Sequence, residues 1–204
     1  MTWSYDLLWR KAQLYAQLTI EQDREGELFP LWAAFTLEFV ARATLAHVHP
    51  GLLADPRAGG EHLLYAHGFG AVERPLSVSA KTLFDRCRTI VPAFTDQDRI
   101  HCMALIERRN AELHSGETAF AGYLTNMWLA RFFRACSVLL AFQGKNLEQL
   151  FGADEAAAAA RMVAAAEAEL LTEVRRRIAD TQAVFLARPV AEIERARATP
   201  YVRN

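Results

Sequence analysis

The segment from Leu28 to about His49 limits the possible folds more than any other part of the sequence. Apolar side chains recur along it at helical spacing and cover most of its circumference. A helix that is apolar on nearly every side needs other helices around it. Within it, Glu38 and Arg42 are four residues apart and are expected to pair. Since no part of the chain shows the apolar–polar alternation of strands, we expect an all-α protein with this helix in the middle of a helical bundle.

Other stretches of helical periodicity flank this segment. Further helices are expected at residues 3–22, 79–92, 95–116 and 120–143, and a long alanine-rich helix at residues 154–188. Ser4 can cap the first of them, and Thr95 begins a pattern that resembles a capping box. Gly116 is expected to end the 95–116 helix in the left-handed conformation. Glycines and prolines predict a long irregular connection from Pro50 to Ser77, with a short helical turn around residues 61–66.

The composition is that of an ordinary globular protein. The chain has 204 residues, 52% of them hydrophobic and 23% charged, which fits a single helical domain over residues 1–204. A formal net charge of -1 argues against a surface that coats nucleic acid, so any RNA affinity has to be local. The three cysteines lack metal-ligand spacing and are expected to be buried in a reducing compartment. Since no targeting segment or run of transmembrane length is recognised, a cytoplasmic location is expected.

The stretch Glu107–Gly116 places several polar side chains at the end of a predicted helix. On a helical wheel, Arg109 falls on the apolar row of that helix, whereas Arg108 turns outward to solvent. Asn110 and His114 are four residues apart and lie on a flank next to Arg109. A guanidinium, an amide and an imidazole are therefore expected to meet at the edge of the buried face.

These three groups suit chemistry on a phosphodiester. The imidazole of His114 can accept or donate a proton near neutral pH. The guanidinium of Arg109 can grip a phosphate and stabilise charge that develops on it, and Asn110 can orient either group or the ligand. No carboxylate pair or set of metal ligands accompanies them, so the natural mechanism is metal-free, with the 2′-hydroxyl of RNA as the nucleophile. The alternative interpretation is structural: Arg109 pairs with Glu38 or Asp98, and His114 only caps its helix.

The run Arg109-Asn110-Ala111-Glu112-Leu113-His114 resembles the R-(N/D)-x-x-x-H signature of HEPN domains (higher eukaryotes and prokaryotes nucleotide-binding). The order of the helices around this motif also resembles that of HEPN domains, and the resemblance covers about residues 28–144. The extra N-terminal helix and the long C-terminal helix of about residues 153–188 lie outside it. The resemblance implies an up-and-down helical bundle that dimerises and brings two copies of the motif into one cleft. Many HEPN members are metal-independent endoribonucleases of toxin–antitoxin, phage-defence and CRISPR-linked systems. In them the motif Arg and His cleave RNA through attack by the 2′-hydroxyl, roles that would fall here to Arg109 and His114, assisted by Asn110.

Three further arginines are candidates for binding RNA. Arg131 and Arg134 follow the motif closely and are expected to add positive charge to the same cleft, and Arg108 beside the motif can do the same. A solvated helix face is the alternative interpretation of these arginines. The histidines at positions 47, 49, 62 and 67 fit no strong ligand pattern, so neither a metal nor another cofactor is expected.

The sequence thus predicts an endoribonuclease of HEPN type that acts as a toxin or as a defence or stress effector. RNA, a second copy of the chain and an antitoxin or regulatory protein are the expected partners, and no membrane is expected. Two alternatives stay open. One is a catalytically silent HEPN-like module that binds RNA, a nucleotide or a protein, and the other is a structural helical protein that assembles through its alanine-rich helix.

Overall fold

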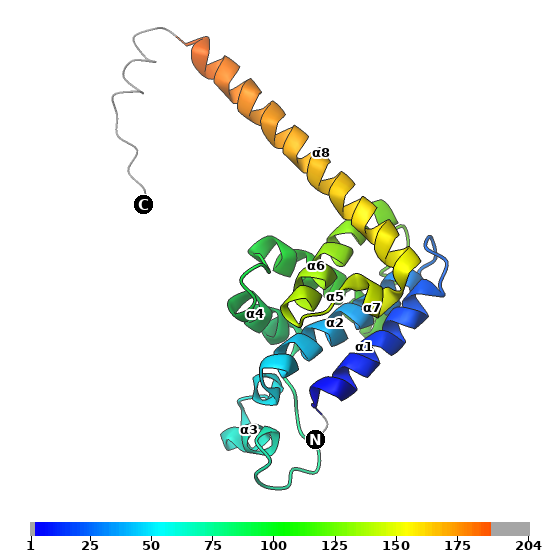
Figure 1. The fold of residues 1–204 in the computed structure, drawn as a ribbon, viewed down its shortest axis with the longest axis vertical. Coiled ribbons are helices and arrows are strands. Elements are labelled where there is room, and N and C mark those ends of the chain that lie inside the picture. Colours follow the sequence, from blue (N-terminus) through cyan, green and yellow to red (C-terminus); the bar gives the residue numbers. More distant parts are fainter. Residues whose placement is uncertain (1–2, 189–204) are drawn as a thin grey trace. The chain divides into compact units, whose positions relative to one another are not determined.

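A computed structural model describes residues 3–188, and most of these residues are helical (Figure 1). The chain divides into two compact units, Met1–Val163 and Ala164–Asn204. The α-helices in the described residues are α1 (Tyr5–Ile20), α2 (Leu28–Val48), α3 (Glu61–Ala66), α4 (Ala80–Ile90), α5 (Asp96–His114), α6 (Leu129–Phe142), α7 (Leu147–Phe151) and α8 (Ala153–Leu186). Short 3₁₀ turns occur at Pro50–Leu53, Ala58–Gly60 and Thr125–Met127. The described residues form no strand, so the prediction of an all-α protein is confirmed.

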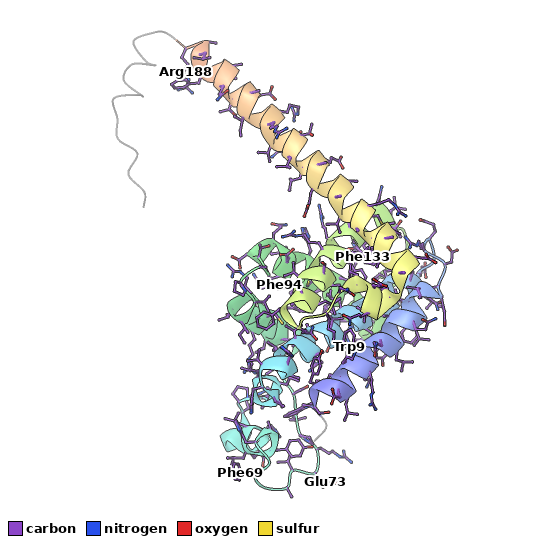
Figure 2. The ribbon with its side chains drawn as sticks, viewed as in Figure 1. Trp9, Phe69, Glu73, Phe94, Phe133 and Arg188 are labelled. Atoms are coloured by element: carbon purple, nitrogen blue, oxygen red, sulfur yellow. The ribbon has the colours of Figure 1, made fainter. Side chains whose placement is uncertain are left out.

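The core of the first unit is built around α2, as its apolar sequence predicts. The side chains of Leu37, Val40 and Leu45 are at most 1% exposed, and α1, α4, α5 and α6 all contact this helix. Phe94 and Phe133 on neighbouring segments are equally buried (Figure 2). Of the described helices, α2 is the one whose length and composition would allow it to cross a membrane. However, 61% of its most apolar 18-residue stretch is buried inside the protein.

The first helix, α1, lies along α2 (Figure 1). Ser4 caps its first turn, as predicted, by accepting a hydrogen bond from a backbone N–H. The contact with α2 uses Ala12 and Ala16, both fully buried, because small side chains let the two backbones approach closely. The hydroxyls of Thr19 and Thr36 share a buried hydrogen bond of 3.0 Å across this contact. Each hydroxyl also lies within donating distance of a carbonyl one turn earlier in its own helix, so the pair fixes the register of α1 on α2.

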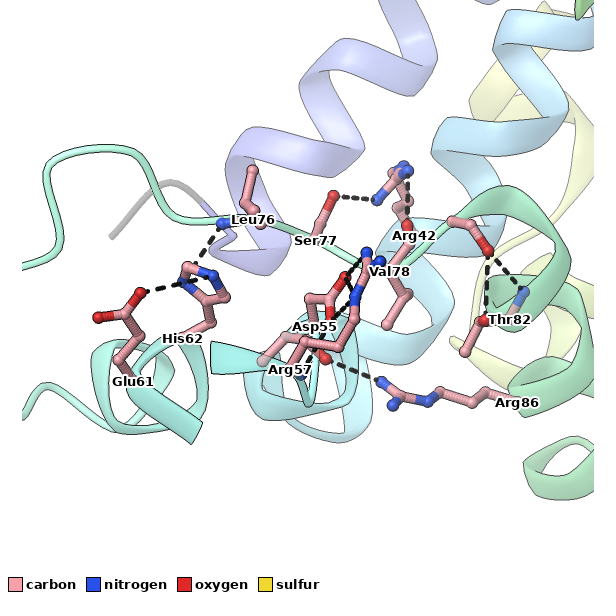
Figure 3. A network of polar contacts seen from close by, with 12 residues as sticks. Arg42, Asp55, Arg57, Glu61, His62, Leu76, Ser77, Val78, Thr82 and Arg86 are labelled. Atoms are coloured by element: carbon pink, nitrogen blue, oxygen red, sulfur yellow. Dashed lines mark hydrogen bonds and ion pairs between the residues drawn. The ribbon is translucent and has the colours of Figure 1, made fainter. Parts of the chain in front are cut away.

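Polar contacts hold the irregular connection between α2 and α4 to the helices (Figure 3). Arg42 donates to the hydroxyl of Ser77 at 3.0 Å, and Arg86 donates to a backbone carbonyl of the connection. The buried carboxylate of Asp55 accepts hydrogen bonds from the side chain and the backbone N–H of Arg57, which hold the pKa of that carboxyl well below its usual range. The predicted short helical turn is present as α3. The connection is therefore ordered despite its glycines and prolines.

The helix expected at residues 120–143 begins later than predicted. α6 starts at Leu129, and residues 115–128 form turns in which Gly122 has a φ of 69°, a left-handed value that glycine adopts without strain. Phe120 is nevertheless only 3% exposed. The apolar spacing that suggested a helix here comes from side chains that reach the core from a loop.

The end of α5 also differs from the prediction. Gly116 does not adopt a positive φ, and the C-cap is Ser115 with φ -129° and ψ 176°. The Ser115 hydroxyl donates to the carbonyl of Ala111 at 2.7 Å and accepts from the backbone N–H of Glu117 at 3.1 Å. Because this side chain satisfies polar groups at the helix end, the helix ends without a left-handed glycine.

The alanine-rich sequence forms α8 as one continuous helix that enters the second unit. From Ala164 to Arg188 no side chain described by the structure is buried. Arg176 and Arg177 both pair with Glu173 one turn earlier, at 2.8 and 2.6 Å. Pairs at this spacing support an exposed helix, and solvent screens them. This part of α8 is stabilised by the high helix propensity of alanine and by ion pairs within the helix itself.

Candidate functional site

A capping box fixes the start of α5, the helix that carries the candidate motif. The hydroxyl of Thr95 accepts a hydrogen bond from the backbone N–H of Asp98 at 3.1 Å, and the carboxylate of Asp98 accepts from the backbone N–H of Thr95 at 2.8 Å. Asp98 is 3% exposed and also accepts from Nε of Arg134 on α6 at 3.0 Å. This ion pair ties α5 to α6. It also engages Arg134, one of the arginines expected to bind RNA.

Arg109 lies on the buried face of α5, as the helical wheel predicts. Its Nη2 donates to Oε2 of Glu38 on α2, and Oε1 of the same carboxylate accepts from Arg42 at 2.7 and 3.0 Å, which confirms the predicted Glu38–Arg42 pair. The Arg109 and Glu38 side chains are only 14% and 12% exposed. The ring of Phe35 lies 5.1 Å from the Arg109 guanidinium and adds a cation–π contact. Two arginines thus share one carboxylate largely away from solvent.

This cluster of Glu38, Arg42 and Arg109 carries two positive charges against one negative charge. In addition, the Nε–H of Arg109 is buried and has no hydrogen-bond partner among the described residues. A buried donor without an acceptor and an uncompensated positive charge both favour an anion nearby. One of these contacts is the Arg109–Glu38 ion pair, which was expected if the motif has only a structural role. Arg109 is therefore a core arginine as well as a candidate for binding phosphate.

Asn110 and His114 lie one turn apart on an exposed flank of α5. Within the described part of the chain, neither side chain hydrogen-bonds to another residue, and no bond joins either of them to Arg109. In one copy of the chain the imidazole and the amide are therefore accessible to a ligand. The guanidinium next to them is held in place by Glu38.

Arg108 and Glu112 hold the loop that follows α5. Arg108 donates to the carbonyl of Ala119 at 2.7 Å, and its guanidinium lies 4.1 Å from the ring centroid of Tyr123. Glu112 accepts from the backbone N–H of Ala119 at 2.8 Å. Arg108 is exposed, as the sequence predicts, yet it folds back onto this loop. Its charge is thereby placed beside Tyr123.

A cavity of about 150 Å³ opens on the same flank as Arg108. Its apolar wall includes Leu37, Leu105 and Phe132, and its polar groups include His101, Tyr123 and Arg131. Burial lowers the pKa of His101, and the nearby charge of Arg131 lowers it further. Burial raises the pKa of Tyr123, against the opposing effect of Arg108 and Arg131. Both rings are therefore uncharged at neutral pH.

The cavity and the motif lie on different flanks of α5. Nine residues separate His101 from Asn110, and at about 100° per residue their side chains are half a turn apart. Arg131 lines the cavity and Arg134 is ion-paired. The fold of a single copy therefore gives these two arginines positions other than the flank of Asn110 and His114.

Sequence reasoning did not identify His101, Tyr123 or Trp128 as members of a site. One signal was available, because His101 and Arg108 are seven residues apart and so share a face of the helix. Tyr123 and Trp128 could not be placed in this way. They reach the cavity only because residues 115–128 form a loop that returns to α5.

Neither the cysteines nor the histidines assemble into a metal-binding group within the described residues. Cys87, Cys102 and Cys136 are buried, as expected. Burial raises the pKa of each thiol, to about 12 for Cys87. The buried thiols are therefore protonated and act as small apolar side chains. Of the histidines, His49 and His67 stack on each other, with 4.4 Å between their ring centroids.

No family model matches the chain, and no curated protein or solved structure shows significant similarity to it. The resemblance to HEPN domains thus rests on the Arg109–His114 motif and the order of helices around it.

Proposed function

We propose that the protein is a HEPN-like, metal-independent endoribonuclease with a site built on Arg109, Asn110 and His114. The observation that carries this proposal is the arrangement on α5: an exposed imidazole and an exposed amide lie on the helix that also carries Arg109, whose counter-charge Glu38 is shared with Arg42. A phosphodiester is a ligand that all three groups can serve. The resemblance of the motif to the HEPN signature supports RNA as the substrate.

In the proposed reaction, His114 takes the proton of the 2′-hydroxyl. O2′ then bonds to phosphorus while the bond between phosphorus and O5′ breaks, and O5′ takes up a proton from a second imidazole. The products are a 2′,3′-cyclic phosphate and a 5′-hydroxyl. Arg109 stabilises the negative charge on the phosphoryl oxygens, and Asn110 orients the phosphate or the imidazole.

A homodimer is part of this proposal, because the reaction uses two imidazoles and each chain supplies one His114. Arg108, Arg131 and Arg134 then add to the positive field that attracts RNA toward the cleft. The proposed cellular role is that of a cytoplasmic toxin or defence effector under the control of an antitoxin or regulatory protein.

A non-catalytic HEPN-like module that binds RNA, a nucleotide or a protein is the second candidate. The burial of Arg109 favours it, because a guanidinium that is 14% exposed and paired with Glu38 offers few donors to a phosphate. In that case Arg109 serves the fold, and Asn110 and His114 contact the ligand without cleaving it.

Cleavage of labelled RNA in EDTA separates the two candidates. We expect His114→Ala to lower the cleavage rate by about 100-fold or more, the usual contribution of a general acid or base. Its thermal stability should not change, because His114 is exposed. Arg109→Lys keeps the charge but loses the planar fork, so it should also cleave poorly. His67→Ala, another exposed histidine, is the matched control and should cleave normally.

Cleavage that requires a divalent metal, or that continues in His114→Ala, would overturn the proposed reaction. RNA binding without cleavage in the parent protein would favour the non-catalytic module. Mass spectrometry of the fragment ends tests the chemistry, since 2′-hydroxyl attack leaves a cyclic phosphate. Light scattering tests the dimer, and a monomer at the concentration of the assay would contradict a site with two imidazoles.

A further inference from the structure

The cavity beside α5 has the size and shape of a small-ligand site. Its volume of about 150 Å³ equals that of a cavity that holds a benzene ring. Leu105 and Phe132 supply apolar wall, and the rings of Tyr123 and Trp128, which stack on each other with 5.9 Å between centroids, also line the cavity. Aliphatic and aromatic walls of this kind favour an apolar ligand.

The polar groups of the cavity are donors rather than carboxylates. Arg131 is exposed at the cavity and makes only a long hydrogen bond of 3.4 Å to the carbonyl of Met127, so its guanidinium is available. The amide of Gln97 lies 2.8 Å from Nε2 of His101, and with this nitrogen as the acceptor, Nδ1 carries the proton of the neutral ring. No aspartate or glutamate lines the cavity. A cation would therefore be repelled, and an anion would be attracted.

Trp128 provides an independent sign of a missing partner. It lines the cavity and is 5% exposed, and its Nε1–H is buried without a hydrogen-bond acceptor among the described residues. Buried indole N–H groups in proteins usually have an acceptor. This donor is enclosed, so an oxygen atom of a ligand would satisfy it only after a shift of the indole.

We propose that this cavity binds a small aromatic acid, with a single ring against the apolar wall of Leu105 and Phe132 and a carboxylate toward Arg131. The ring is matched to the volume and the walls, and the carboxylate to the donors. A simple anion such as acetate would leave the apolar wall unfilled. A neutral ring would leave the guanidinium without a counter-charge. Binding requires both features in one molecule.

This site is separate from the proposed ribonuclease site, since it lies on the opposite flank of α5 from Asn110. The proposal does not depend on RNA cleavage. The cavity does contact the loop that joins α5 to α6, because Tyr123 belongs to both. A ligand here would contact the loop that begins next to His114.

Titration with benzoate, followed in ¹H–¹⁵N spectra of the full chain, tests the proposal. The chain has four tryptophans, and Trp128→Phe identifies the indole signal that belongs to Trp128. We expect benzoate to shift this signal with saturation, and benzyl alcohol and acetate to bind at least about tenfold more weakly because each lacks one feature. Arg131→Gln should weaken benzoate binding at least about tenfold through loss of a charge-assisted hydrogen bond.

Arg10→Gln is the control, because Arg10 is an exposed arginine of α1 that does not line the cavity. It should bind benzoate like the parent protein. Three results would overturn the proposal: no saturable shift of the Trp128 signal up to about 10 mM benzoate, equal binding of acetate and benzoate, or unchanged affinity in Arg131→Gln. The Arg131 side chain is exposed, so this variant should fold, and dispersion of the same spectra verifies it.

Discussion

Replacement of Glu38 by glutamine should reveal how much the fold depends on the shared carboxylate. The substitution keeps the shape of the side chain but leaves Arg42 and Arg109 beside each other without their counter-charge. Removing one member of a buried ion pair typically costs about 3–5 kcal/mol. These side chains are 12–14% exposed, so water relieves part of that penalty. The amide oxygen still accepts one hydrogen bond, which offsets about 1 kcal/mol.

We therefore expect Glu38→Gln to lower the free energy of unfolding by about 2 kcal/mol. For a body of this size that corresponds to a decrease in Tm of roughly 4–8 °C. Tryptophan fluorescence is a suitable probe, because all four tryptophans belong to the unit Met1–Val163. Urea unfolding at pH 7 gives the free energy, and a thermal scan gives the Tm.

Glu107→Gln is the matched control, because Glu107 is an exposed glutamate of α5, the helix that carries Arg109. Its effect should stay within about 0.5 kcal/mol. In the double variant Glu38→Gln/Arg109→Gln one of the two stranded charges is gone and Arg42 no longer faces a second arginine, so its loss of stability should be smaller than the sum of the two single losses. A loss below about 0.5 kcal/mol for Glu38→Gln, or strict additivity in the double variant, would refute the argument that this carboxylate neutralises buried arginines.

Three further predictions concern other parts of the first unit. Thr95→Ala removes the capping hydroxyl that Asp98 uses and should cost about 1 kcal/mol in urea unfolding, whereas an unchanged midpoint would argue against the cap. The Asp55 carboxylate, with its pKa lowered by Arg57, stabilises the fold fully above the ordinary aspartate pKa of about 3.9 and loses this effect as the pH falls further. The Tm difference between the parent and Asp55→Asn should therefore shrink below about pH 4, and a constant difference would contradict this. Burial raises the pKa of Cys87 to about 12, and the other two cysteines are also buried, so a thiol reagent should label the protein only in denaturant.

The sequence predicted the features that follow from local periodicity and capping. The apolar circumference of α2 indicated its central position, and the wheel separated the buried Arg109 from the exposed Arg108. The Ser4 and Thr95 caps follow from side chains that bond to their own helix. Each of these predictions depends on residues within about one turn of each other, so no tertiary information was needed.

The features that the sequence did not predict depend on how segments meet. Gly116 suggested a left-handed helix end, but the Ser115 hydroxyl satisfied the terminal groups instead. Phe120 continued a helical spacing from within a loop, because burial in the core depends on the path of the chain and not on its local conformation. The cavity combines His101 with Trp128, and that pairing required the loop after α5 to fold back.

The exposure of α8 beyond Ala164 implies two regimes of amide protection in this protein. An amide of α2 can exchange with solvent only when the core opens, so its protection should follow the global stability of the body. Among the residues that the structure describes, amides near Ile178 have only their own helical hydrogen bonds, and a helix held by such bonds alone frays in about a microsecond or less. Hydrogen exchange should therefore be fast along this stretch, and substitutions in the core should leave its rate unaltered.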